Sequence, residues 1–127
     1  MAGETRYEIT VTTRNHYVPE QSDEKAERFA FVYTITLRNT GTISAQLISR
    51  HWIITDGRNR IEEVRGLGVV GMQPRLLPGE SFEYTSGTVI ATSAGTMRGS
   101  YQMLAEDGTT FHATIAEFTL SAPHALH

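Results

Sequence analysis

The chain has 127 residues, of which 39% are hydrophobic and 20% charged, and its formal net charge at pH 7 is −3. This size and composition predict one globular domain over residues 1–127 and exclude a disordered protein. The negative charge argues against non-specific binding to nucleic acid, and the absence of cysteine excludes disulfides, thiol catalysis and cysteine-ligated zinc.

The first seven residues are polar and lack the apolar segment of a signal peptide. No apolar run approaches the roughly 20 residues that cross a bilayer as a helix. We therefore expect a cytoplasmic protein without membrane insertion.

The first half of the chain predicts three strands. Polar and apolar residues alternate over residues 7–12, as in a strand with one face in water. They alternate again over residues 29–37, where the second face is also apolar and a central strand is expected. The charged residues 19–27 between them form a predicted surface loop with room for one helical turn. Residues 45–55 predict the third strand, with Ile48, Arg50, Trp52 and Ile54 on one face and Leu47, Ser49, His51 and Ile53 on the other.

Turn signals separate the strands that follow. Asp56-Gly57 predicts a two-residue hairpin into a short strand over residues 60–64. Pro74 and Pro78 exclude a regular helix, and Pro78-Gly79 predicts a turn into a strand around residues 82–84.

The last third predicts two more strands. Ala94-Gly95 is a turn signal, and the strand after it carries Met97, Tyr101 and Met103 on its inward face. Asp107-Gly108 predicts a second tight hairpin into a strand with apolar positions 111, 113 and 115. The apolar phase then changes to positions 118 and 120, which predicts a bulge near Ala116. The end is a short tail, so the ordered core is expected to span roughly residues 5–122 with short flexible ends.

About seven short strands separated by turn signals, without a helical pattern, predict an all-β fold. A single antiparallel β-sandwich fits this pattern. A small β-barrel is the alternative, and the periodicity does not distinguish the two.

The segment Gly66-Leu67-Gly68-Val69-Val70-Gly71 has the G-x-G-x-x-G spacing of dinucleotide-binding sites. In those sites the glycines precede a helix whose N-terminus faces the pyrophosphate. Here two valines favour a strand and Pro74 leaves no room for a helix. The sequence therefore excludes a Rossmann-type site.

A weaker anion site remains open for the same segment. Glycine backbone can form a concavity of N–H groups without a helix, and the segment is flanked by Arg58, Arg60, Arg65 and Arg75. The candidate residues for pyrophosphate or another anion are Gly66, Gly68, Gly71, Arg65 and Arg75. The alternative role is structural, because glycine permits a bulge or the close approach of another strand.

Other polar residues predict no chemistry. His16, His51 and His112 lack the spacing of metal ligands, and His124 and His127 lie in the predicted tail. The adjacent Glu62 and Glu63 would point to opposite faces of a strand, so they do not form an acid/base pair. We therefore predict no catalytic residue, no metal site and no cofactor, and we expect Trp52 to fill the core between the sheets.

From His51 to Gly87 the sequence resembles the bacterial ApaG family, also called CorD. The resemblance rests on the blocks HWIITD, EEVRG, GVVG, QPRL and PGESFEYTSG and, further on, GTMRGSYQM and EDG. Residues 12–19 and 33–35 also fit the family, so the resemblance covers nearly the whole chain apart from its ends.

The resemblance implies a single ApaG-type domain with a fibronectin type III-like, immunoglobulin-like sandwich of seven strands. It also implies a link to cobalt resistance, magnesium efflux and diadenosine tetraphosphate metabolism. Related domains in a eukaryotic F-box protein and in a protein that interacts with DNA polymerase delta imply protein–protein contacts. The family's pyrophosphate motif falls on Gly66, Gly68 and Gly71, and the family carries over no catalytic residue.

Two functions follow from these observations. The first is a non-catalytic sandwich that binds an unidentified protein through residues 58–75, with Arg65 and Arg75 as contacts. The second is a module that holds a nucleotide or pyrophosphate on residues 66–71. A hydrolase of dinucleoside polyphosphates ranks last, because such chemistry recruits divalent metal through grouped carboxylates and the sequence shows none.

Overall fold

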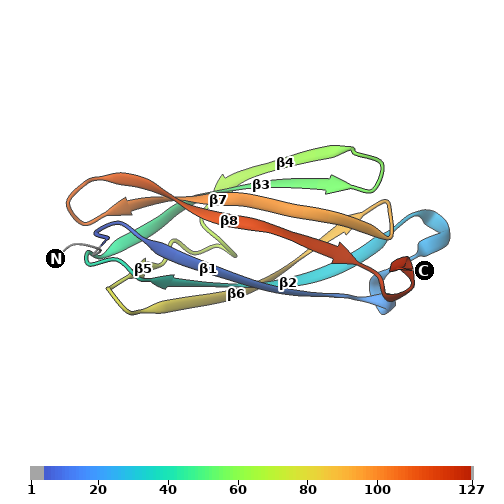
Figure 1. Ribbon diagram of the computed structural model, residues 1–127, viewed down its shortest axis with the longest axis horizontal. Coiled ribbons are helices and arrows are strands. Elements are labelled where there is room, and N and C mark those ends of the chain that lie inside the picture. The colour runs from blue at the N-terminus through green and yellow to red at the C-terminus, as the bar shows by residue number, and fades with distance from the viewer. Residues whose placement is uncertain (1–4, 127) are drawn as a thin grey trace.

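The computed structural model describes residues 5–126 as strands joined by turns and short loops (Figure 1). Its strands are β1 Ile9–Tyr17, β2 Phe29–Asn39, β3 Ala45–Asp56, β4 Ile61–Leu67, β5 Arg75–Leu76, β6 Ser81–Ile90, β7 Ala94–Ala105 and β8 Thr110–Ser121. Single 3₁₀ turns are η1 Pro19–Gln21, η2 Glu24–Ala26 and η3 Pro123–Leu126. No helix in residues 5–126 has the length and apolar character needed to span a membrane.

The strands form two antiparallel sheets. One has the order β1-β2-β6, and the other has the order β4-β3-β7-β8, with the two-residue β5 paired to the start of β3. The seven predicted strands are all present and β5 is additional, so the predicted all-β antiparallel sandwich is confirmed. The alternation of apolar and polar residues produces this fold, because it gives each sheet one apolar face, and the two apolar faces are buried against each other.

The core lies between the sheets and is centred on Trp52, whose exposed fraction is 2%. Its ring packs edge-on against Tyr33 of the facing sheet, with centroids 5.3 Å apart. Tyr101 and Phe118 pack on it from its own sheet at 6.4 and 6.0 Å. The prediction that Trp52 fills the space between the sheets is confirmed.

The two flanks of the sandwich differ. On one flank β1 and β8 lie side by side (Figure 1), and the Asn15 side chain donates a hydrogen bond to the Thr119 carbonyl at 3.2 Å. On the other flank, β4 pairs only with β3 and β6 pairs only with β2. All four strands are sheet edges with one neighbour each, but β1 and β8 pack against each other, whereas β4 and β6 do not. We therefore call the β1/β8 flank closed and the β4/β6 flank open.

Two bulges set which residues face the core. The predicted bulge near Ala116 is confirmed, because Met97 pairs with Phe118 whereas Gly99 pairs with Ile115. An unpredicted irregularity lies between Leu47 and Ser49 in β3. It places Leu47 in the core with Trp52, so the prediction that Ile48 shares the Trp52 face was wrong.

Two turn predictions were also wrong. Asp56-Gly57 does not form a two-residue hairpin, because Asp56 bonds to Arg60 through the backbone and Asn59, at φ 63°, supplies the left-handed position. The Asp56 carboxylate holds this wider loop by accepting from the N–H of Arg58 and Arg60 at 2.8 and 3.0 Å. Strand β4 consequently runs over residues 61–67 and not 60–64.

Ala94-Gly95 is not a turn but the start of β7, since the chain reverses over residues 91–93. At the C-terminal end, η3 occupies part of the predicted tail, and the imidazole of His124 lies 2.9 Å from the Glu24 carboxylate. The predicted flexible ends fall mainly on residues 1–4 and 127, which are outside the described residues.

Candidate functional site

The glycine segment, residues 66–71, ends in a two-residue turn. Val69 and Met72 exchange backbone hydrogen bonds of 2.8 and 2.9 Å. Val70 and Gly71 between them have φ angles of 44° and 78°. Two positive φ values in a two-residue loop define a type I′ turn, a conformation that suits Gly71 but is uncommon for a β-branched residue. The segment thus leads into a turn and not into a helix.

Three N–H groups of the glycine segment, those of Gly66, Gly68 and Val69, are used inside the fold. Gly66 pairs with Arg50 in the β3–β4 ladder, and the Gly68 N–H donates to the Ile48 carbonyl at 2.8 Å. For the N–H groups of Val70 and Gly71, by contrast, residues 5–126 offer no hydrogen-bond acceptor. The free donors are therefore those at the tip of the turn.

Each glycine of the motif has a structural role. A side chain on Gly68 would collide with the Met72 carbonyl, and the φ angle of Gly68 is 63°. A Cβ atom on Gly66 would lie 2.9 Å from the guanidinium of Arg50. Gly66 is therefore the position that lets the Arg50 side chain lie flat across β4.

Arg50 is the arginine that approaches the glycine segment. Its Nη1 donates to the carbonyls of Leu67 and Gly68 at 3.0 and 2.8 Å. The side chain is half-buried on the inward face of β3, next to Trp52 and opposite Gly66. Arg50 was not predicted as a site residue, although a charged residue on the inward face of an apolar strand is a signal for such a role.

The four arginines that flank the segment do not converge on it. Each has a carboxylate partner elsewhere: Arg58 with Glu27, Arg60 with Asp56, Arg65 with Glu63 and Arg75 with Glu106. Arg65 lies 3.3 Å from its partner on the outer face of β4, and Arg75 lies 3.9 Å from its partner. Gly66 and Gly68 therefore contact Arg50, and Gly71 lines a cavity with it. Arg65 lines a hollow on the outer face together with Arg50 and Gly66, whereas Arg75 pairs with Glu106.

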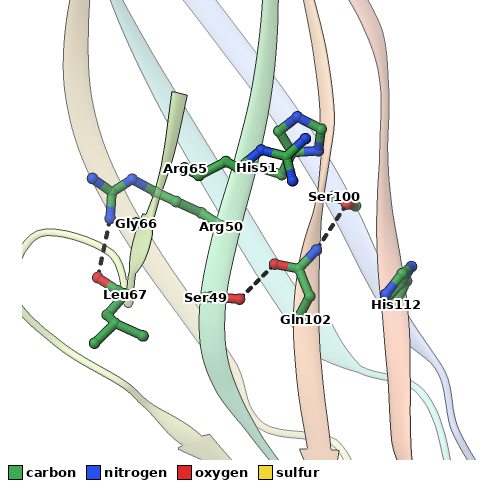
Figure 2. Close-up of a pocket in the computed structure, with 9 residues that line it drawn as sticks. All are labelled: Ser49, Arg50, His51, Arg65, Gly66, Leu67, Ser100, Gln102 and His112. Atoms are coloured by element: carbon green, nitrogen blue, oxygen red, sulfur yellow. Dashed lines mark hydrogen bonds between the residues drawn. The ribbon is translucent and has the colours of Figure 1, made fainter. Parts of the chain in front are cut away.

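A shallow depression of about 590 Å³ lies on the outer face of β4, β3, β7 and β8 (Figure 2). Across its floor the Ser49 hydroxyl donates to the Gln102 side-chain oxygen at 2.6 Å, and the Gln102 side-chain nitrogen donates to Ser100 at 3.0 Å. At its rim His51 lies 2.7 Å from Glu63, and this hydrogen bond lowers the pKa of the Glu63 carboxyl. The hydroxyl and amide groups on its floor are therefore bonded to one another, and the depression also exposes apolar surface.

A second hollow is a groove along the open flank, which we call the β4/β6 groove. It consists of adjoining cavities of 420 and 310 Å³ that share Tyr33, Arg50, Trp52 and Ser86 as lining. A cavity of 220 Å³ continues it toward Ile61 and Val89, and shares Glu62 with its neighbour. Glu62 thus faces the groove while Glu63 faces outward, as predicted for adjacent strand residues.

Exposed apolar side chains border the glycine segment. The exposed fractions of Leu67, Val70 and Met72 are 75%, 55% and 51%. These three side chains, which we call the apolar tip, extend from the end of β4 through the two-residue turn. An exposed apolar cluster on a small protein is a common feature of interaction sites.

Metal ligands do not gather around either hollow. Over the part of the chain that the structure describes, no three histidine, aspartate or glutamate side chains come close enough to hold a metal ion. His51 and His112 both line the outer depression, but His51 is bonded to Glu63.

Comparison with known proteins gives a consistent result. A family model for the ApaG domain (DUF525) matches residues 19–105. The chain is 61% identical over 127 residues to the protein ApaG of Nitrosospira multiformis, and the match covers 100% of both chains. It is 60% identical over the full length to the protein ApaG of Nitrosomonas europaea.

The fold is also similar to a solved structure. The crystal structure of a protein described as the putative ApaA protein from Bordetella pertussis is 55% identical and superposes with a TM-score of 0.91. The match covers 94% of this chain and 98% of the other.

Proposed function

Because the chain belongs to the ApaG family, we propose that it is a non-catalytic module that binds another protein in the cytoplasm. The observation that carries this proposal is the apolar tip, Leu67, Val70 and Met72, at the end of the edge strand β4. Free strand edges and apolar loop residues are the two features that β-sandwiches use to bind partners.

The conformation of Val70 supports a binding role for the tip. A valine with a φ of 44° is strained, and glycine or asparagine would serve the turn better. Its side chain is also more than half exposed, so burial in the monomer does not compensate for the strain. Strained residues commonly occur where function requires a particular side chain.

A capture experiment tests this placement. Full-length protein with a tag is used to recover partners from a bacterial lysate, and the recovered proteins are quantified by mass spectrometry. We expect Leu67→Ser with Met72→Ser to lose the partner, and charge reversal of Arg65 and Arg75 to weaken its capture. The matched control is Leu104→Ser, an exposed leucine on β7 outside the tip. Equal recovery by all variants would contradict the placement.

A second function is a pyrophosphate- or nucleotide-binding module on the glycine segment. The observation in its favour is that the N–H groups of Val70 and Gly71 are free at the tip of the turn. Against it, the carbonyl oxygens of Leu67 and Gly68 point at Arg50 and would repel an anion that approached from that side. Consecutive free N–H groups can bind an anion without a helix.

NMR titration distinguishes the second function from the first. ATP, a dinucleoside polyphosphate and inorganic pyrophosphate are added separately to ¹⁵N-labelled protein. Binding at the turn would shift the amide resonances of Val70 and Gly71 in a saturable way. Unchanged resonances at millimolar ligand would reject this function and leave the protein-binding proposal intact.

The implied link to cobalt, magnesium and diadenosine tetraphosphate is assigned in this proposal to the bound partner. The module would act by recruiting a protein that handles the ion or the nucleotide. If cells that carry folded apolar-tip variants lose cobalt resistance, this assignment would be supported.

A further inference from the structure

The β4/β6 groove lies between two strand edges that have no partner. β4 bonds only to β3 and β6 only to β2, so the outward backbone groups of both strands are available to an added strand. The floor of the groove is formed by Tyr33 and Trp52, and Ile61 and Val89 at one end are 66% and 44% exposed. An extended chain is the shape that both edges and the length of the groove accommodate.

Arg50 gives the groove a cation without a counter-ion. Within residues 5–126 it is the one arginine that is half-buried, the others being exposed. No carboxylate of the described chain lies within salt-bridge distance of it, whereas six other arginines have such a partner. A guanidinium at this depth interacts strongly with a carboxylate, because water screens it incompletely.

Glu62 provides the opposite charge further along the groove. It lines two of the cavities, one of them together with Arg60, whose ion pair is with Asp56. Among the described residues no cationic group forms an ion pair with Glu62. Arg50 pairs with Gly66 and Glu62 pairs with Ile54, so the two charges are four strand positions apart. At about 3.3 Å per residue this corresponds to roughly 13 Å along the groove.

We propose that the groove binds an extended segment of the partner protein that carries an acidic side chain against Arg50 and a basic side chain against Glu62, four residues away. The proposal rests on the proposed protein-binding function and gives it a partner chemistry. Four positions is an even spacing, so both side chains of an extended segment point to the same face. A pair three positions apart would point to opposite faces.

Selection from a random peptide library tests the proposal. Peptides of about twelve residues are displayed on phage and selected on the full-length protein; they are long enough to cover the seven residues of β4. We expect the enriched sequences to contain an acidic and a basic residue four positions apart, with apolar residues at the other even positions. Moving the basic residue by one position in a synthetic copy should reduce affinity about tenfold or more.

Substitutions in the groove test whether Arg50 binds the acidic side chain of the peptide. Arg50→Gln should bind the selected peptide about tenfold more weakly or worse, and Arg50→Glu should prefer the peptide whose acidic residue is changed to lysine. Ser86→Asp tests the same point without removing Arg50, because it places a carboxylate inside the groove that would compete with the peptide. Arg98→Gln, on the exposed face of β7, is the matched control and should bind normally. Circular dichroism confirms that each variant folds.

The outcomes separate the inference from the proposed function. Enriched peptides that lack an acidic residue and bind Arg50→Gln as well as wild type overturn the inference but leave the binding function in place. No enrichment on the folded protein overturns the inference, and the capture experiment with apolar-tip variants decides the binding function separately. Saturable binding of inorganic pyrophosphate at Arg50, without peptide enrichment, would assign the groove to a small anion and also overturn the inference.

Discussion

At the scale of single residues, Val70 shows a conflict between local preference and position. A β-branched residue at positive φ costs of order 1–3 kcal/mol, and the exposed side chain of Val70 gains little from packing in the monomer. The sequence could not predict this, because the Val69-Val70 pair is typical of a strand and the two-residue turn depends on Met72 pairing back with Val69.

Replacing Val70 should therefore stabilise the fold. We expect Val70→Gly to raise the free energy of unfolding by about 1 kcal/mol, because relief of strain exceeds the extra entropy of the unfolded chain. Urea denaturation followed by Trp52 fluorescence measures it. Val89→Gly, the same change in the regular strand β6, should instead lower stability by about 1 kcal/mol. A less stable Val70→Gly protein would show that the turn is not strained.

A second residue-scale feature is the pair of hydroxyl groups of Tyr84 and Tyr101, which bond to each other inside the core. Burial raises the pKa of Tyr84 to about 12 from an ordinary 10.0, and burial also raises the pKa of Tyr101. The folded state therefore holds these protons more tightly than the unfolded state does.

This difference predicts alkaline destabilisation. Below pH 10 the two tyrosines are protonated in both the folded and the unfolded state, so they cause no change of stability with pH. Above pH 10 they ionise first in the unfolded state, so the free energy of unfolding falls as the pH rises toward 12. Changing both tyrosines to phenylalanine should make this part of the curve flatter in urea denaturation. An equal slope in the double variant would reject the explanation.

At the scale of elements, the pattern of apolar residues was sufficient to predict the strands but not the loops that connect them. Alternation placed all seven main strands, and the phase change near Ala116 located the bulge in β8. The prediction of a two-residue hairpin at Asp56-Gly57 was wrong, because the Asp56 carboxylate caps a longer loop in which Asn59 takes the left-handed position. Such side-chain capping is a property of the closed loop, which local spacing does not show.

The loop between β7 and β8 is tied to the start of the chain. The Tyr7 hydroxyl donates to the Asp107 carboxylate at 2.5 Å, and the Tyr7 ring packs on Phe111 with centroids 5.6 Å apart. The hydrogen bond from Tyr7, with one from the Thr109 N–H, lowers the pKa of Asp107 to about 2 from an ordinary 3.8.

The contact between Tyr7 and Asp107 predicts how the stability of the fold changes at acid pH. A lowered pKa stabilises the fold above pH 3.8, and the contribution is lost as the pH falls toward 2. Tyr7→Phe should therefore be less stable than wild type at neutral pH, with a difference that shrinks between pH 4 and pH 2. Thermal unfolding across this range measures it. When both proteins also carry Asp107→Asn, the difference in stability between the protein with Tyr7 and its Tyr7→Phe variant should be the same at every pH.

At the scale of the whole molecule, the contrast between a closed and an open flank could not be read from the sequence. Strand order is a long-range property, and residues 61–67 gave no sign that they form an edge of the β4/β6 groove. The same holds for the site: the glycine motif was visible, but Arg50 joins it only because β3 and β4 pair in one register.

Hydrogen exchange should reveal the two flanks. We expect outward N–H groups of β4 and β6 to exchange about tenfold faster than those of β1 and β8, whose edges shield each other. The central strands β2, β3 and β7 are bonded on both sides and should exchange slowest. Mass spectrometry of exchanged peptides, or NMR, makes the measurement. Equal rates at all four edges would contradict the distinction between the flanks.

The position of Trp52 also constrains how the protein is made. Its ring is covered by Tyr33, Tyr101 and Phe118, so the covering groups come from both halves of the sequence. A nascent chain cannot bury this tryptophan until β8 has left the ribosome. Folding must therefore wait until β8 has been synthesised, and Trp52 fluorescence during translation would report the moment at which the core closes.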